Sequence, residues 1–150
     1  MLNIRRAAAG DAEALRDLYS NHLSPDYPEE PRDMAALRES ITRFGRDPLY
    51  HLLVGEAEGR LVSSVTLIIV ENLTHGLRPY ALIENVVTRA EFRGRHYATA
   101  LMNRAGEIAA GAGCYKIMLL TGSKKESTLN FYENLGFNKN DKTAFIKWLD

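Results

Sequence analysis

The sequence predicts a mixed α/β protein of layered architecture, with a twisted and mostly antiparallel sheet covered by helices. Two observations carry this prediction. Apolar residues alternate at period two in some segments and recur at helical spacing in others. These segments follow one another as strand, two helices, three strands, helix, strand, helix and strand, an order that suits one sheet with helices packed on it.

The first third of the chain is predicted to form a short strand and two helices. Residues 3–7 form the strand, and Asp11 can cap a helix that runs to about Leu23. Residues 32–44 form the second helix, because apolar residues recur there at intervals of three, four and three. Segment 24–31 holds three of the five prolines and is expected to be a loop.

The middle of the chain is predicted to contribute three strands. Residues 50–56 and 60–70 form a hairpin that turns at Glu58-Gly59. Residues 80–88 form the next strand, and apolar side chains on both of its faces indicate a central, doubly buried position.

The last third of the chain is predicted to contain two helices and two strands. A helix over residues 94–110 follows the central strand as a crossover connection, and a strand over 115–121 comes next. A short helix over 128–135 ends at Gly136 in a Schellman motif, with the hydrophobic residue that such a motif requires directly after the glycine. Residues 143–149 are expected to form the last strand.

Length and composition indicate one domain of ordinary globular character. The 150 residues are 45% hydrophobic and 25% charged. No repeat or linker divides them, so residues 1–150 are expected to form a single domain with about six to seven strands and about four helices. Nineteen basic residues balance nineteen acidic ones, which argues against a protein that binds nucleic acid through a basic surface.

Several further function classes are not expected. The longest aliphatic run, residues 67–70, is too short to span a membrane, and the first twenty residues lack the apolar core of a signal peptide. Cys114 is the only cysteine, so no intrachain disulfide can form. His22, His51 and His75 stand singly, without the spacing of metal ligands, so no metal is expected. A cytoplasmic protein is the expectation.

The most informative stretch runs from Ile83 to Ala98, where an apolar strand ends, a short basic loop turns and a helix begins. The first turn of a helix presents unpaired N–H groups and the positive end of the helix dipole, so it can hold a phosphate. Gly94 lets the backbone approach closely. Positive charge comes from Arg89, Arg93 and Arg95. This stretch suits the binding of a pyrophosphate-bearing cofactor. It is explained equally well as a plain strand–turn–helix corner with solvated arginines.

Two motifs resemble those of the GNAT superfamily of N-acetyltransferases. That family carries Q/R-x-x-G-x-G/A where backbone amides hold the pyrophosphate of CoA. Arg93 matches the first position and Ala98 the last, whereas His96 replaces the middle glycine and could either crowd the phosphate or donate a hydrogen bond to it. The late family motif F-Y-x-x-x-G-F is matched from Phe131 to Phe137. The order of helices and strands predicted for nearly the whole chain also resembles the order in that family.

The resemblance implies a GNAT fold with splayed central strands, between which the pantetheine arm of the co-substrate acetyl-CoA lies. Backbone groups of Val86 and Val87 would pair with that arm, and a main-chain N–H there would polarise the thioester carbonyl. Ser127 and Asn130 would touch the arm or cap their own helix. The cofactor-binding residues implied are Val86, Val87, Arg93, Gly94, Arg95, His96, Tyr97, Ala98, Thr99, Ser127 and Asn130.

The resemblance also implies two catalytic residues. Tyr132 stands where the family tyrosine protonates the departing thiolate, and a phenol is protonated at neutral pH. A helical tyrosine that only packs by its ring is the alternative. Glu84 is the candidate base for the amine; alternation places it beside Leu82 and Val86, and burial there would raise its pKa. A structural carboxylate paired with an arginine or a tyrosine is the alternative.

The acceptor amine stays open. Gly113-Cys114-Tyr115-Lys116-Ile117 and Ile83-Glu84 resemble stretches of the glucosamine-6-phosphate N-acetyltransferases. The connection 124–128 is similar to that of the aminoalkylphosphonate acetyltransferases. The acceptor pocket is expected from loops 24–32 and 71–79, because loops vary more than the scaffold. The residues expected there are Tyr27, Arg32, His75 and Arg78. An arginine with a tyrosine suits an anionic acceptor.

The expected function is therefore the transfer of an acetyl group from acetyl-CoA to a primary amine of a small molecule, by direct attack. A protein or peptide N-acetyltransferase is one alternative, and a non-catalytic acyl-CoA-binding module is the other. The expected partner is a small-molecule amine, with neither nucleic acid nor a membrane, and a homodimer stays open.

Overall fold

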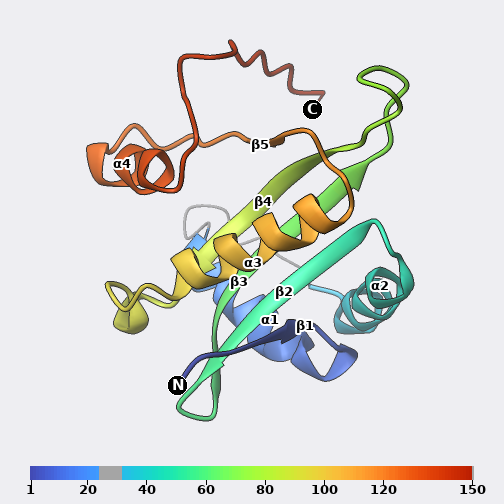
Figure 1. Cartoon of the computed structure of the whole chain (residues 1–150). Helices are drawn as coiled ribbons and strands as arrows, with labels where there is room; N and C mark the ends of the chain where they lie inside the picture. The colour runs from blue at the N-terminus through green and yellow to red at the C-terminus, as the bar shows by residue number, and fades with distance from the viewer. Residues whose placement is uncertain (24–31, 150) are drawn as a thin grey trace. The chain divides into compact units, whose positions relative to one another are not determined.

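A computed structural model of the chain describes residues 1–23 and 32–149. The chain forms two compact units, residues 1–118 and residues 119–150, and each is described by itself. The strands are β1 (Asn3–Arg6), β2 (Tyr50–Ala57), β3 (Arg60–Val70), β4 (Tyr80–Thr88) and β5 (Ile117–Leu119). The helices are α1 (Ala12–Leu18), α2 (Met34–Arg46), α3 (Tyr97–Gly111) and α4 (Glu126–Asn134), with short helical turns at η1 (Ala9–Asp11), η2 (Tyr19–Leu23) and η3 (Ala90–Phe92) (Figure 1).

The sheet has the strand order β1-β2-β3-β4-β5, and strands β1 to β4 pair antiparallel. Beyond β4 the direction changes. The Tyr115 amide donates to the Pro79 carbonyl, and the Ala81 amide donates to the Lys116 carbonyl. Because both segments advance together through these bonds, the segment that leads into β5 runs parallel to β4. The prediction of a mixed and mostly antiparallel sheet is confirmed.

The hairpin between β2 and β3 turns where the sequence predicts it. Glu58 and Gly59 both have positive φ angles, 54° and 73°, which is the conformation of a type I′ turn. The twist of such a turn matches the right-handed twist of the strands it joins, and β2 pairs with β3 from Ala57↔Arg60 to Tyr50↔Ile68, with one irregularity between Gly55 and Glu56.

The predicted number of strands is too high. In the described part of the chain there are five strands instead of six to seven, and residues 143–149 form no strand. The apolar residues of that segment are exposed, with Phe145 at 90% and Trp148 at 81% of full exposure. An apolar pattern indicates that a segment can pair, but a strand also needs a neighbour with free backbone groups, and the pattern does not specify one.

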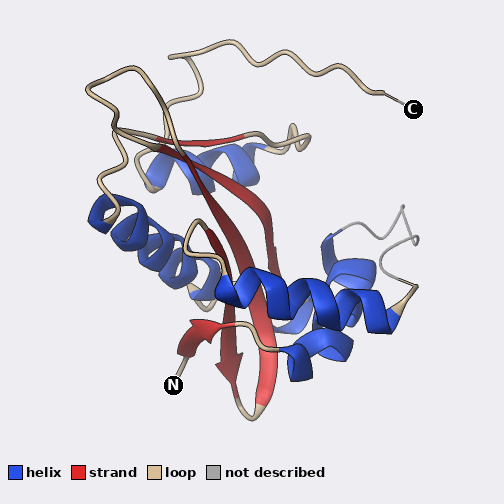
Figure 2. Ribbon diagram, turned by 90° about the vertical axis from the view of Figure 1, so that its right-hand side faces the viewer, coloured by secondary structure: helices blue, strands red, loops and turns tan. Residues whose placement is uncertain are grey.

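Helices cover both faces of the sheet in the first unit, with α1 and α2 on one face and α3 on the other (Figures 1 and 2). On the first face, buried side chains of the two helices meet buried side chains of the strands: Ala12, Leu15, Leu18, Ile41, Leu52, Val54, Leu61 and Val87. On the second face, Leu101 is fully buried against β2 at Gly55, where an added Cβ would lie 2.9 Å from a Leu101 methyl carbon. Each buried aliphatic side chain stabilises the fold by roughly 1.5–3 kcal/mol.

Three helix ends are closed by local capping contacts. The Asp33 carboxylate caps α2 by accepting from the Ala36 amide at 3.0 Å. Gly113, at φ 81°, closes α3 in a Schellman motif in which the Cys114 amide donates to the Ala109 carbonyl. In the second unit, Gly136 at φ 91° closes α4 in the same way, and the Phe137 amide donates to the Tyr132 carbonyl.

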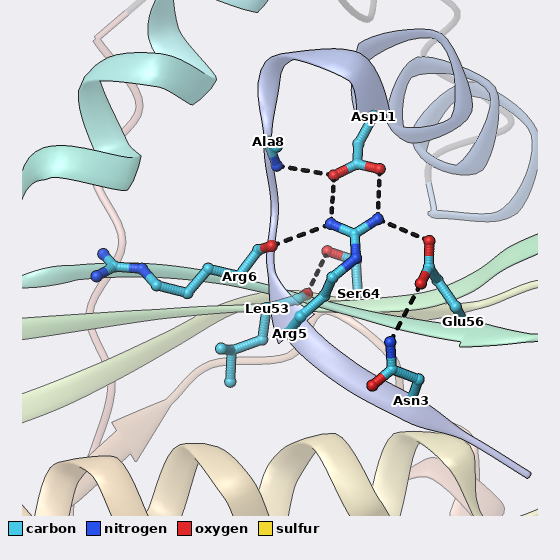
Figure 3. A network of polar contacts seen from close by, with 8 residues as sticks. All are labelled: Asn3, Arg5, Arg6, Ala8, Asp11, Leu53, Glu56 and Ser64. Atoms are coloured by element: carbon cyan, nitrogen blue, oxygen red, sulfur yellow. Dashed lines mark hydrogen bonds and ion pairs between the residues drawn. The ribbon is translucent and has the colours of Figure 1, made fainter.

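The predicted cap at Asp11 is wrong. Its carboxylate makes no cap for α1; it accepts from the Ala8 amide and from both terminal nitrogens of Arg5, at 2.7 and 2.8 Å (Figure 3). Arg5 also donates to Glu56 on β2 at 2.7 Å. A bidentate pair with a guanidinium is stronger than a bond to one backbone amide, so Arg5 of β1 takes the carboxylate, and a turn of 3-10 helix, η1, precedes α1.

Candidate active site

The corner between β4 and α3 has the geometry of an anion site. After Thr88 the chain makes the turn η3, and the α3 helix begins at Tyr97 with His96 as its N-cap residue. No side chain caps this helix, and the Ala100 amide is the first to bond back, to the His96 carbonyl at 3.0 Å. The amides of residues 97–99 therefore have no partner within the helix and point out of its positive end.

Two residues of the corner have left-handed backbone conformations. Gly94 has a φ of 76° and His96 a φ of 60°. This conformation turns successive amides toward one side of the backbone, as anion-binding nests do. Glycine adopts it without strain, whereas histidine is one of the few other residues that do so with any frequency. The His96 side chain is exposed, and the expected residues Tyr97, Ala98 and Thr99 lie half-buried on the first helical turn.

The arginines of the corner are bonded to the protein. Arg89 is only 8% exposed; its Nε donates to the Leu61 carbonyl at 2.8 Å and it pairs with Asp17 at 2.6 Å. The Arg93 Nε donates to the Thr88 carbonyl at 3.2 Å. Arg95 pairs with Glu58 on the hairpin tip at 2.8 Å, which raises the pKa of Arg95 above its ordinary value. Arg95 also lies over the Phe92 ring. Each of the three arginines thus has a partner within the protein, while Arg93 and Arg95 stay exposed to solvent.

Glu84 lies at a bulge in β4. Thr66 of β3 pairs with Glu84 and Ser64 pairs with Val87, so Asn85 and Val86 together oppose a single residue of β3. Asn85 has a φ of 53°, the left-handed conformation of a bulge residue. The sequence predicts Val86 on the same face as Glu84. The bulge interrupts the alternation, so Glu84 instead shares its face with Val87. That face is the one covered by α1 and α2.

The expected burial of Glu84 is wrong, because both Glu84 and Asn85 are exposed. The alternative role, a structural carboxylate paired with an arginine or a tyrosine, finds no arginine within the described residues, where none of the ion pairs involves Glu84. Its electrostatic neighbour is a tyrosine. Burial first and the charge of Glu84 second raise the pKa of Tyr50 on β2.

Tyr50 and Tyr19 were not singled out as site residues by the sequence analysis, although they lie on the same face as Glu84. Tyr50 pairs with Ile68 of β3, two residues from Thr66, the partner of Glu84. The Tyr50 ring stacks on the Phe44 ring of α2, with 3.9 Å between the ring centroids. The Tyr19 hydroxyl lies 3.4 Å from the Ser64 hydroxyl. Strand alternation could have placed Tyr50 on one face of β2, but only the cross-strand register brings it close to Glu84.

The valines expected to meet the pantetheine arm lie at the end of β4. Val87 is buried, and its carbonyl accepts a hydrogen bond from the Ser63 hydroxyl at 2.8 Å. Val86 is half-buried and belongs to the bulge. The bulge therefore changes the direction of the Val86 backbone relative to a regular strand.

The remaining candidate site residues, in and just before the late motif, belong to the second unit. Ser127 and Asn130 lie within α4 and neither is its cap, because Lys125 is the N-cap residue and makes no side-chain cap bond. Tyr132 forms edge contacts with the rings of Phe131 and Phe137 at 5.0 and 6.2 Å. The contact with Phe137 is the hydrophobic contact of the predicted Schellman motif, which is confirmed.

The residues expected at the acceptor are partly tied to the scaffold. Tyr27 lies outside the described residues, and Arg32 is exposed just before α2. The His75 ring stacks on Tyr115 at 3.9 Å. Arg78 donates to the Gly113 and Cys114 carbonyls, both at 3.2 Å. These contacts hold the β3–β4 connection against the end of α3.

A groove of about 570 Å³ lies along that connection, at the end of β4 opposite to the corner. Its walls are mostly apolar, with one carboxylate: Pro48, Leu49, Ile69, Glu71, Asn72, Leu73, Leu77, Pro79 and Ala112. Among residues 1–23 and 32–149, no cluster of three or more His, Cys, Asp and Glu could hold a metal ion. Within the same ranges, no helix is long and apolar enough to cross a bilayer.

Comparison with known proteins decides the family. The profile of the Acetyltransferase (GNAT) family matches residues 12–137, most of the chain. The chain belongs to the GNAT family of acetyltransferases. As a GNAT-family N-acetyltransferase, it is 38% identical over 121 residues to a glucosamine 6-phosphate N-acetyltransferase of Trypanosoma brucei brucei, which covers 81% of this chain and 79% of the relative.

Two further GNAT relatives match over most of their length. Glucosamine 6-phosphate N-acetyltransferase 1 of Oryza sativa subsp. japonica is 30% identical over 149 residues, covering 87% of this chain and 86% of the relative. A solved structure of a putative acetyltransferase from Agrobacterium tumefaciens superposes with a TM-score of 0.86 at 39% identity, covering 97% of this chain and 99% of that one. The GNAT fold predicted from the sequence is confirmed by this superposition.

Proposed function

We propose that this chain transfers the acetyl group of acetyl-CoA to a primary amine of a small molecule. The uncapped start of α3, preceded by the left-handed residues Gly94 and His96, carries the proposal. Free amides at the positive end of a fifteen-residue helix suit a pyrophosphate, and acetyl-CoA supplies a pyrophosphate together with the thioester that the family's chemistry consumes.

The residues proposed to hold acetyl-CoA act mainly through their backbone. The amides of residues 94–99 receive the pyrophosphate, while the guanidinium of Arg93 fixes the loop by its bond to Thr88. Val86 and Val87 face the pantetheine arm, and Ser127 and Asn130 contact it from α4. The amide at the bulge is the proposed donor to the thioester carbonyl, where negative charge develops as the amine attacks.

The proposed reaction is a direct transfer. The amine nitrogen forms a bond to the thioester carbonyl carbon, the carbon–sulfur bond breaks, and CoA leaves as a thiolate. Glu84 takes the proton that the amine loses, directly or through a water molecule, and Tyr132 gives a proton to the thiolate. An exposed Glu84 is accessible to an incoming ammonium ion, which a carboxylate attracts.

The first acceptor to test is an amino sugar phosphate. Two relatives that match most of this chain carry the name glucosamine 6-phosphate N-acetyltransferase. The face that holds Glu84, Tyr50 and Tyr19 offers a carboxylate and phenolic groups, which suit an amine and neighbouring hydroxyl groups. We also propose that residues 1–150 act as one domain, because the family match runs from the first unit into the second.

A thiol-release assay with acetyl-CoA tests the proposal. The acceptors are glucosamine 6-phosphate, glucosamine, an aminoalkylphosphonate, lysine, a polyamine and an unstructured peptide with a free N-terminus. We expect thiol release with a small-molecule amine well above the rate without acceptor. Release only with the peptide would favour a protein acetyltransferase, and acetyl-CoA binding without release on any acceptor would favour a non-catalytic module.

A further inference from the structure

The turn η2 contacts the cofactor corner through His22. The Ala90 amide donates a hydrogen bond to the His22 Nδ1 atom at 3.2 Å, across sixty-eight residues of sequence. Ala90 is the first residue of η3, and the first amides of a short helical turn have no partner inside it. The imidazole therefore supplies the acceptor that the turn itself lacks.

The donor fixes the protonation of the ring. An amide N–H can only donate, so Nδ1 must carry a lone pair and the hydrogen of the neutral imidazole must lie on Nε2. Neither the opposite tautomer nor the imidazolium can accept this bond. Among the forms of histidine, the contact is consequently specific for this one tautomer.

The same stretch of chain holds the corner at two further points. Asp17, at the end of α1, pairs with Arg89, whose Nε also donates to the Leu61 carbonyl. The His22 carbonyl accepts from the Arg93 Nη2 at 3.4 Å. Residues 17–22 thus contact Arg89, Ala90 and Arg93, three of the five positions that lead from β4 into Gly94.

The conformation of the corner depends on such external contacts. The helix that follows has no side-chain cap, and Gly94 and His96 lie in a backbone region that few residues occupy. Backbone amides recognise a phosphate only when they are held in the correct direction beforehand. Only the four-residue turn 93–96 separates η3 from α3, so a shift of η3 would be passed on to the amides of residues 94–99.

We infer that His22 is a positioning residue for the cofactor: its neutral imidazole holds the turn η3, and so directs the amides at the start of α3 toward the pyrophosphate of acetyl-CoA. The inference rests on the proposed binding of acetyl-CoA at this corner. It gives His22 no contact with the acetyl group or the amine, so the residue acts on cofactor affinity and not on the chemical step.

Three variants test it: His22→Ala, His22→Asn and the control His51→Ala, whose ring lies at the start of β2 and is hydrogen-bonded to the Pro48 carbonyl. Calorimetry gives the acetyl-CoA affinity, and steady-state kinetics give KM and kcat. His22→Ala should weaken affinity and raise the KM for acetyl-CoA by roughly two- to tenfold, the range of one hydrogen bond, with kcat unchanged at saturation. His22→Asn should restore both values, because Asn Oδ1 takes the place of Nδ1. His51→Ala should match the native protein.

Thermal unfolding without ligand accompanies each measurement, and affinities are compared at a temperature where every variant is folded. His22→Ala that binds acetyl-CoA as tightly as the native protein overturns the inference, and so does His22→Asn that binds as weakly as His22→Ala. Those outcomes leave the proposed function intact, provided the native protein binds acetyl-CoA. A native protein that does not bind it overturns both.

Discussion

At the scale of single residues, His96 shows how a departure from a family motif can be accommodated. The family carries glycine where this chain has histidine, and the φ of 60° at His96 explains the family's choice. An L-residue in this region costs roughly 1–2 kcal/mol relative to its ordinary conformations. The cost is confined to the backbone, because the imidazole is exposed.

Substitution His96→Gly should therefore raise the free energy of unfolding by up to about 1 kcal/mol, with strain relieved in the folded state and part of the gain lost to the greater entropy of the unfolded chain. His96→Val should lower it by more than about 1 kcal/mol, since a β-branched residue is poorly tolerated there. Urea unfolding measures both. Acetyl-CoA affinity should be kept or improved in His96→Gly; a loss of affinity without a loss of stability would mean that the imidazole contacts the phosphate.

Glu84→Gln addresses the proposed base. The side chain is exposed, and substitutions at such sites change stability by no more than about 0.5 kcal/mol. Turnover should fall by roughly 10² to 10⁴-fold, because the amide cannot take the proton from the amine. The acidic limb of the pH–rate profile should be lost or displaced, and acetyl-CoA affinity should be retained. Full activity with the native acidic limb would assign the proton to another group or to water.

At the scale of elements, the junction of β1 and η1 links an early strand to the start of α1. Asp11 is held by Arg5 and by the Ala8 amide, and these bonds lower the pKa of Asp11 below its ordinary value, with the Arg5 bond as the largest cause (Figure 3). A carboxyl group whose pKa is lower in the folded state contributes stability above its unfolded pKa, near 3.9, and loses that contribution as the pH falls through its folded pKa.

Substitution Asp11→Asn should reduce the free energy of unfolding by about 1–2 kcal/mol at pH 7, because charged hydrogen bonds are lost from a site that solvent partly reaches. The difference from the native protein should shrink as the pH falls below about 4 and disappear once Asp11 is protonated. Urea unfolding over pH 2.5–7 measures this. Glu13→Gln removes an exposed partner of Arg38 on the same side of the molecule and should have no measurable effect. A constant Asp11→Asn difference at all pH values would contradict the assignment.

The elements also show what a single sequence can specify. The hairpin at Glu58-Gly59 and the Schellman stop at Gly136 were predicted because each depends on φ angles that neighbouring residue types determine. The bulge at Asn85 was not, because a bulge is defined by the register with β3. The Asp11 cap was wrong because Arg5, on another element, took the carboxylate. The strand over 143–149 was wrong because an apolar pattern does not supply a partner strand, and no strand formed among these residues.

The candidate site divides in the same way. The helix start at Arg93 to Ala98 was predicted from a local pattern of residue types, and its resemblance to the family motif favoured the cofactor over a plain corner. The contact of His22 with Ala90 and the approach of Tyr50 to Glu84 join residues from distant parts of the sequence. No periodicity or motif encodes them, so only the three-dimensional structure brings them out.

At the scale of the whole molecule, the two compact units should respond together to the cofactor if residues 1–150 act as one domain. Acetyl-CoA at about a hundred times its dissociation constant should stabilise the native state by roughly 2.7 kcal/mol, which raises the melting temperature by roughly 5–10 °C. Hydrogen exchange should slow in the first turn of α3 and in α4. No thermal shift at millimolar acetyl-CoA would remove the cofactor assignment, and protection confined to α3 would leave α4 outside the binding site.

The edge contact between Tyr132 and Phe137 closes α4, so the residue proposed as the acid also secures the end of its own helix. Position 132 is therefore under two constraints in evolution, one from the proposed reaction and one from the end of the helix. A descendant that loses the enzymatic activity no longer needs a proton donor there, but it still needs a ring to keep the helix stop. An aromatic residue at position 132 is therefore a record of the fold, not by itself a sign of a working enzyme.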